Sequence, residues 1–130
     1  VRLPLGLAPD ALRSAWLRAL RRHAALRCRF SLEGANEVPA DSVTLPWREA
    51  DREEAESLGA LALAERSSPL LDDPPLMRLV HLPPALAEAG GHAHLVWTFH
   101  HAMLDGWSAT LLLSEVLADV GASQPTAPLE

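Results

Sequence analysis

Apolar residues recur at helical spacing in three stretches of the chain. The first stretch opens at Pro9 and places Trp16 and Leu20 on one face, and a proline in the first turn is typical of a helix start. The second opens at Asp51, with acidic residues in its first turn, where they complement the helix dipole. We predict three helices, the last ending at Gly121 with one apolar side formed by Leu111, Leu112, Val116, Leu117 and Val120.

Shorter apolar runs between these helices predict strands, with a turn at residues 34–36. The order is then strand, helix, strand, strand, helix, strand, strand, helix. Such an order indicates an α/β chain of the two-layer α+β type, in which helices pack on a mixed sheet. The predicted strands are residues 1–7, 26–32, 42–45, 76–82 and 92–99.

Composition limits the function of the chain more than it defines it. Hydrophobic residues make up 48% of the 130 residues, which is normal for one globular domain or part of one. The formal net charge of −6 disfavours nonspecific binding to nucleic acid, and no apolar run reaches the roughly 18 residues of a membrane span. The single cysteine, Cys28, cannot form an internal disulfide and suits a reducing compartment. We therefore expect a cytoplasmic protein that binds neither nucleic acid nor membrane.

Two adjacent histidines, His100 and His101, follow the last predicted strand. Histidine is the usual general base at neutral pH because its unperturbed pKa is about 6.5. If the strand continues through the pair, His101 shares a face with Trp97 and Phe99, and His100 points the opposite way. One histidine then enters a cavity while the other packs behind the strand.

Asp105 and Gly106 stand between the histidines and the last predicted helix. Asp105 can cap the helix or pair with a basic group that shapes the loop. Gly106 leaves room for a close approach to the backbone, which a side chain would prevent. Strand, loop and helix together concentrate the titratable chemistry of the chain in one turn.

This turn also carries a resemblance to a known family. Residues 100–106, HHAMLDG, match the HHxxxDG signature of the condensation-domain superfamily of nonribosomal peptide synthetases, and Trp107-Ser108 extends the match. Residues 22–30, RHAALRCRF, resemble the RHxxLRxxF segment of the family, and residues 75–79, PLMRL, resemble its PL-x-R strand. The chain thus resembles the N-terminal half of a condensation domain, because the three motifs keep the family's order over most of its length.

The resemblance implies a fold and a reaction. The fold is chloramphenicol-acetyltransferase-like, with two halves, of which this chain would supply the first. The reaction is amide bond formation, in which the amino group of an acceptor attacks the thioester of a donor during nonribosomal peptide biosynthesis, a route to antibiotics. The domain would bind no cofactor itself, because the phosphopantetheine is carried by its partners, the donor and acceptor peptidyl or aminoacyl carrier proteins.

By the same resemblance, His101 is the catalytic residue. It either takes the proton of the attacking amine or holds the amine and the developing oxyanion in place. His100 is expected to be structural, and Asp105 to form a salt bridge with an arginine of the absent half or with Arg27. Gly106 is expected to leave room beside the backbone, and Trp107 and Ser108 are candidates for lining the substrate channel. For Ser108, a hydrogen bond at the helix start is favoured over a nucleophilic role.

Other functions share this signature. Acyltransferases that form esters from CoA or carrier thioesters carry HHxxxDG, as do epimerisation domains, although Trp107-Ser108 favours condensation. A degenerate domain that docks a carrier or a tailoring enzyme is the non-catalytic alternative. The intact His101 and Asp105 argue against it.

A metal site is a further alternative, because His92, His94 and His100 share parity along one predicted strand. No HExxH motif and no cysteine pair accompany these histidines, so we predict that no metal is bound. His92 also adjoins the glycine pair 90–91, where an exposed turn is expected.

The motif positions also predict the domain limits. Residues 1–122 are expected to form the N-terminal subdomain of a condensation-like domain, incomplete at its start, and residues 123–130 a linker or exit segment. The chain lacks an initiating methionine, which is expected of a piece of a longer protein. In the family the substrates meet in a tunnel between two halves, so we expect the isolated 130-residue chain to be inactive.

Overall fold

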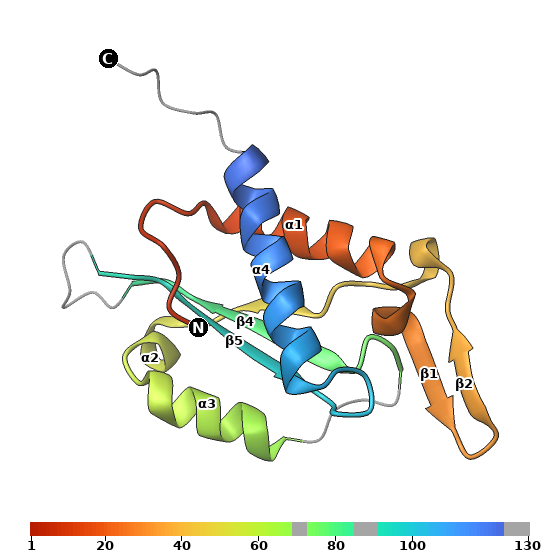
Figure 1. Cartoon of the computed structure of the whole chain (residues 1–130). Helices are drawn as coiled ribbons and strands as arrows, with labels where there is room; N and C mark the ends of the chain where they lie inside the picture. Colours follow the sequence, from red (N-terminus) through yellow and green to blue (C-terminus); the bar gives the residue numbers. More distant parts are fainter. Residues whose placement is uncertain (69–72, 85–90, 124–130) are drawn as a thin grey trace.

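In the computed structural model, which describes residues 1–68, 73–84 and 91–123, helices cover both faces of a three-stranded sheet (Figure 1). A separate two-stranded hairpin projects beyond the end of the first helix. The elements, in chain order, are α1 (Pro9–Arg22), the 3₁₀-helix η1 (Ala24–Arg27), β1 (Cys28–Ser31), β2 (Gly34–Glu37), the 3₁₀-helix η2 (Ala40–Ser42), β3 (Trp47–Glu49), α2 (Arg52–Ala55), α3 (Leu58–Ser67), β4 (Met77–Leu82), β5 (His94–Phe99) and α4 (Gly106–Ser123).

The sheet has the order β3-β4-β5 and is mixed, as predicted. β3 runs parallel to β4, whereas β4 and β5 are antiparallel, with Leu79 opposite Trp97. The start of the chain lies along the outer edge of β5, where Leu3 donates a backbone hydrogen bond of 2.8 Å to Ala93. Residues 1–7 therefore contribute a single bridge, between Arg2 and His94, instead of the predicted strand.

The two faces of the sheet bury different helices. Side chains alternate along a strand, so Leu79 and Leu95 face α1 and α4, while Val80 and Val96 face Leu61 of α3. The prediction of helices packed on a mixed sheet is confirmed, and α3 adds a layer on the second face. Among the described residues, no helix has both the length and the apolar character to cross a bilayer.

α1 and α4 cross over the first face and are joined by ion pairs at their rims (Figure 1). Arg18 donates to Asp119 at 2.8 Å, and Arg22 pairs with Glu115. Trp16 of α1 is completely buried between the helix and the sheet, with its ring 4.8 Å from that of Trp97. The strand that leads to the histidines is thus held from above by two helices.

Two predictions for the first half of the chain are wrong. Residues 42–45 form no strand: Ser42 ends η2, and Val43 and Leu45 bury their side chains without entering a strand ladder. The predicted turn at 34–36 lies in β2, which begins at Gly34, and the chain reverses at Leu32 and Glu33 instead. Gly34 has a φ of 132°, a conformation that only glycine adopts readily.

Two predictions for the helices also need correction. The single helix expected from Asp51 is in fact two helices. Asp51 and Glu54 form a capping box that starts α2, the helix ends at Ala55, and a second helix, α3, begins at Leu58. Gly121 does not end the last helix, because it keeps a negative φ and α4 continues to Ser123. Ser123, the first residue of the predicted linker, therefore belongs to α4, and residues 124–130 lie outside the described part.

Candidate functional site

The turn after β5 is built by backbone hydrogen bonds around His100. The strand ends at Phe99, and the His100 N–H donates to the Leu76 carbonyl at 3.0 Å. The His100 carbonyl accepts from the Met103 N–H at 3.0 Å, and its ring Nδ1 accepts from the Ala102 N–H at 3.0 Å. His100 is exposed and does not pack behind the strand. Its ring instead stabilises the turn, because Nδ1 accepts the hydrogen bond from Ala102.

His101 is the exposed ring at the end of an aromatic row. Its centroid lies 5.9 Å from that of Phe99 in an edge-on arrangement, and Phe99 lies 4.7 Å from Trp97. His101 thus keeps the face predicted for it, although the strand has already ended. Within the described part of the chain its ring makes no hydrogen bond or ion pair, so its nitrogens are open to solvent.

Asp105 caps α4. Its Oδ1 accepts from the Ser108 N–H at 2.7 Å, and its carbonyl accepts from the Ala109 N–H at 2.9 Å. Hydrogen bonds from the backbone and hydroxyl of Ser108, and from the backbone of Trp107, hold the pKa of Asp105 below its ordinary value, although desolvation opposes them. Of the two roles open to this carboxylate, helix capping is the one that the described residues display.

The predicted salt bridge between Asp105 and Arg27 is not formed. Arg27 is buried and bonds to Glu37 at 2.8 Å and to the Val38 carbonyl at 2.7 Å, both at the end of the β1–β2 hairpin. It also donates to two carbonyls in the last turn of α1, those of Leu20 and Arg21. Arg27 therefore joins the hairpin to α1 and satisfies carbonyls that the helix end leaves open.

The remaining predicted residues start α4. Gly106 is its first residue. A Cβ at this position would meet no described atom within 4 Å, so no close contact with the described residues requires a glycine there. Trp107 is 75% exposed, while Ser108 is half-buried. The predicted hydrogen bond of Ser108 at the helix start is present, and substrate contacts of these residues stay predictions.

Sequence reasoning missed Glu115, which binds both leading residues of the RHxxLR segment. Its carboxylate pairs with Arg22 and lies 2.8 Å from His23 Nε2. Burial raises the pKa of Glu115, but hydrogen bonds and charge from His23 and Arg22 outweigh it and leave that pKa below its ordinary value. The available signal was the spacing of Glu115 and Asp119, two acids four residues apart on an otherwise uncharged helix, facing the arginines of α1.

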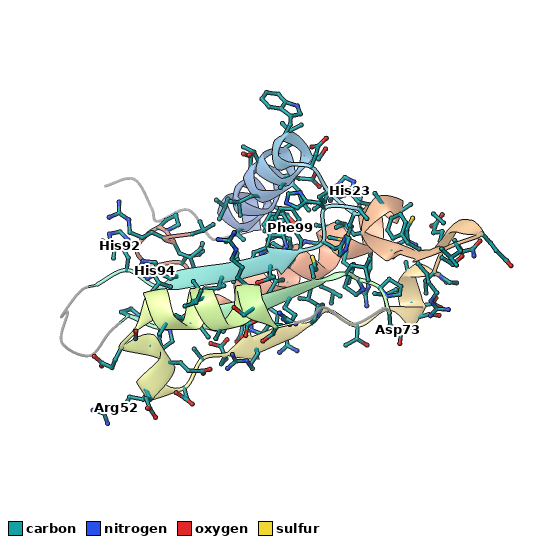
Figure 2. All side chains as sticks on the ribbon, turned by 90° about the horizontal axis from the view of Figure 1, so that it is seen from below. His23, Arg52, Asp73, His92, His94 and Phe99 are labelled. Carbon is teal, nitrogen blue, oxygen red and sulfur yellow. The ribbon has the colours of Figure 1, made fainter. Side chains whose placement is uncertain are left out.

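Two hollows flank α4 near the turn. One, of about 410 Å3, lies between α4 and η1 and includes His23 and Ser108. The other, of about 420 Å3, lies among α4, the edge of β5 and the start of α3, and includes Phe99, Ala109 and Leu58. Figure 2 shows His23 and Phe99 beside α4, where each borders one of the hollows. Space for bound groups therefore opens on both sides of this helix.

The three histidines of the metal alternative do not meet. His92 and His94 lie together at one end of β5, far from Phe99, whereas His100 follows the other end (Figure 2). His92 Nδ1 is 2.8 Å from the Leu3 carbonyl, to which it donates. Across residues 1–68, 73–84 and 91–123, no group of three His, Cys, Asp or Glu side chains is arranged to hold a metal ion.

Comparison with known proteins places these residues in context. The model of the Condensation domain family matches residues 1–120. Chondramide synthase cmdD of Chondromyces crocatus is 39% identical over 123 residues, and a linear gramicidin synthase of Brevibacillus parabrevis is 36% identical over 123 residues. The matches cover 89% and 87% of this chain but only 3% and 2% of those relatives, so the chain spans a small part of their length.

Solved structures share the fold. The condensation domain of the enacyloxin polyketide synthase, described as mediating chain release, is 25% identical with a TM-score of 0.69, and the alignment covers 99% of this chain and 26% of that one. VibH, a condensation enzyme of a nonribosomal peptide synthetase, is 24% identical with a TM-score of 0.64, covering 99% of this chain and 31% of that one. The predicted fold class is confirmed by these similarities.

Proposed function

Because this chain belongs to the condensation-domain family, we propose that it supplies the catalytic site for amide bond formation between carrier-tethered acyl or aminoacyl thioesters in nonribosomal peptide biosynthesis. The observation that carries the proposal is the exposed ring of His101 within the HHxxxDG turn, which makes no hydrogen bond or ion pair to the described residues and packs only edge-on against Phe99. The proposed site comprises His101, its supports His100, Asp105, Gly106 and Arg27, and the channel residues Trp107 and Ser108.

In the proposed reaction the acceptor nitrogen attacks the donor thioester carbonyl. The C–N bond forms, the C–S bond breaks, and the proton lost by the nitrogen ends on the leaving thiol. His101 either removes that proton or holds the amine and the oxyanion, and its open nitrogens suit both roles. The turn fixed by His100 and the cap at Asp105 hold the backbone on either side of the ring.

The partners follow from the same proposal. Donor and acceptor carrier proteins would deliver the substrates on phosphopantetheine arms, and the C-terminal half of the domain would close the site. This chain spans 26–31% of the two solved condensation proteins, which supports a second half outside residues 1–130. The first subdomain would extend through Ser123, the last residue of α4. A cytoplasmic location is part of the proposal, supported by the single, half-buried Cys28.

The test is His101→Ala in the full-length protein, assayed with loaded donor and acceptor carriers. General acid–base catalysis contributes about 10²- to 10⁴-fold, so we expect product formation to fall by that factor while carrier binding is retained. His92→Ala is the matched control, because His92 is half-buried at the opposite end of β5. Unchanged product with His101→Ala would support the docking-module alternative and refute catalysis.

Mild alkaline hydrolysis of the product, followed by tandem mass spectrometry, distinguishes amide from ester formation, because the ester is cleaved and the amide is not. An acceptor offering both an amine and a hydroxyl is expected to yield the amide, whereas an ester would assign the protein to the ester-forming branch. The isolated 130-residue chain is expected to give no product with the same carriers, because the second half is absent from it. Turnover by the isolated chain would show that one half is sufficient.

A further inference from the structure

The hollow between α4 and η1, here called the α4 groove, has no role in the proposed function so far. Its walls are apolar and consist of Ala25, Leu26, Met103, Leu104, Leu111 and Leu112. Its volume of about 410 Å3 falls in the range of small-molecule sites, which are typically 300–1,000 Å3 and mostly apolar with a few placed polar groups.

The α4 groove is continuous with the catalytic turn. Met103 and Leu104 belong to the HHxxxDG sequence itself, and the Met103 N–H bonds to the His100 carbonyl. Ser108, at the rim, bonds to Asp105 of the same motif. A tethered group whose carbonyl or amine is held at the turn therefore has an apolar cavity beside it.

The end of the α4 groove away from the turn carries one carboxylate, Glu115, whose charge is already paired within the protein. Glu115 is bonded to both Arg22 and His23, so its carboxylate is not free to bind a cationic group of a substrate. The same contacts fix α4 against the end of α1, which keeps the walls in place. The chemistry of the cavity thus favours an apolar occupant.

We propose that the α4 groove binds the apolar side chain of one of the two tethered substrates, and that Leu111 determines which sizes are accepted. Leu111 lines the groove and is 55% exposed, so it stands at the rim, where a change of volume alters the opening without emptying the core. The inference rests on the proposed condensation reaction, because that reaction brings the substrates to the turn.

The experiment uses Leu111→Trp and Leu111→Ala in the full-length protein. Donor and acceptor carriers are loaded in turn with alanyl, leucyl and tryptophanyl groups, and kcat/KM is measured for each. Leu63→Trp is the matched control, because Leu63 is a 66% exposed leucine on α3, on the opposite face of the sheet. Thermal melting verifies that each variant is folded.

We expect Leu111→Trp to lower kcat/KM for the tryptophanyl substrate at least about tenfold relative to the alanyl substrate, the lower end of what one methylene group in an apolar pocket discriminates. Leu111→Ala is expected to shift the preference toward the larger group, and it decides the matter if Leu111→Trp does not fold. Equal losses for all three substrates on both carriers would overturn the inference and would indicate that a protein segment covers the groove.

Failure of the inference is distinguishable from failure of the proposed function. If His101→Ala abolishes product but the Leu111 variants keep the wild-type preference, condensation stands and the subsite is refuted. If His101→Ala leaves product unchanged, the catalytic proposal itself is refuted.

Discussion

Replacing Arg27 measures whether this residue acts through its ion pair or through the carbonyls it binds. The Arg27 side chain is 8% exposed, whereas that of its partner Glu37 is 55% exposed. An ion pair with one solvated partner contributes about 0–1 kcal/mol. The main effect of the substitution should therefore come from the carbonyl oxygens that lose their donor.

The magnitude follows from two well-formed hydrogen bonds. Arg27 donates to the Val38 carbonyl at 2.7 Å and to the Leu20 carbonyl at 3.1 Å, while its contact with the Arg21 carbonyl, at 3.4 Å, is weaker. Hydrogen bonds from a charged donor contribute about 1.5–3 kcal/mol each, so Arg27→Ala is expected to lower the free energy of unfolding by about 3–6 kcal/mol. Glu37→Ala is expected to cost no more than about 1 kcal/mol.

Chemical denaturation of the single and double variants gives these free energies. A double-mutant cycle between Arg27 and Asp105 should show a coupling energy within about 0.5 kcal/mol of zero, because the two residues share no contact. If Glu37→Ala costs as much as Arg27→Ala, the ion pair dominates and the reasoning is refuted. A large coupling between Arg27 and Asp105 would restore the salt bridge inferred from the sequence.

Two further predictions concern the cap of α4 and the core. The folded pKa of Asp105 lies below its ordinary value of 3.8, so the capping stability is present above pH 3.8 and is lost as the pH falls through the folded pKa. Asp105→Asn should keep the Ser108 amide protected from hydrogen exchange without this pH dependence, whereas Asp105→Ala should expose it at all pH values. Trp16→Phe should change stability by less than about 1 kcal/mol, because lost contacts are offset by removal of a buried indole N–H without a partner, and calorimetry measures this. A cost as large as the 3–5 kcal/mol typical of Trp→Ala would contradict that account of Trp16.

The elements with strong periodicity were predictable from the sequence. α1 and α4 carry clear apolar faces, and β4 and β5 bury alternating side chains on both faces of the sheet. Residues 42–45 misled the prediction because alternation reports burial and not strand pairing. Val43 and Leu45 are indeed buried, yet the backbone joins the sheet only from Trp47 onward.

The candidate site divides in the same way. The position of the histidine turn was readable because strand, turn and helix are consecutive in the sequence. The partners of Arg27 and His23 could not be predicted from the sequence, because they depend on the tertiary arrangement. The hairpin brings Glu37 to Arg27, and the crossing of α1 and α4 brings Glu115 to His23. Charge alone made Asp105 an equally suitable partner for Arg27.

The pairing of β4 with β5 decides on which side of the molecule the reactive ring emerges. Trp97, Phe99 and His101 share one side, and Trp97 is held opposite Leu79. A slip of one position would turn this whole set toward Leu61 of α3 and send the imidazole to the opposite face of the sheet. The hydrogen bonds between β4 and β5, formed several residues before the turn, therefore determine the face of the sheet on which His101 lies.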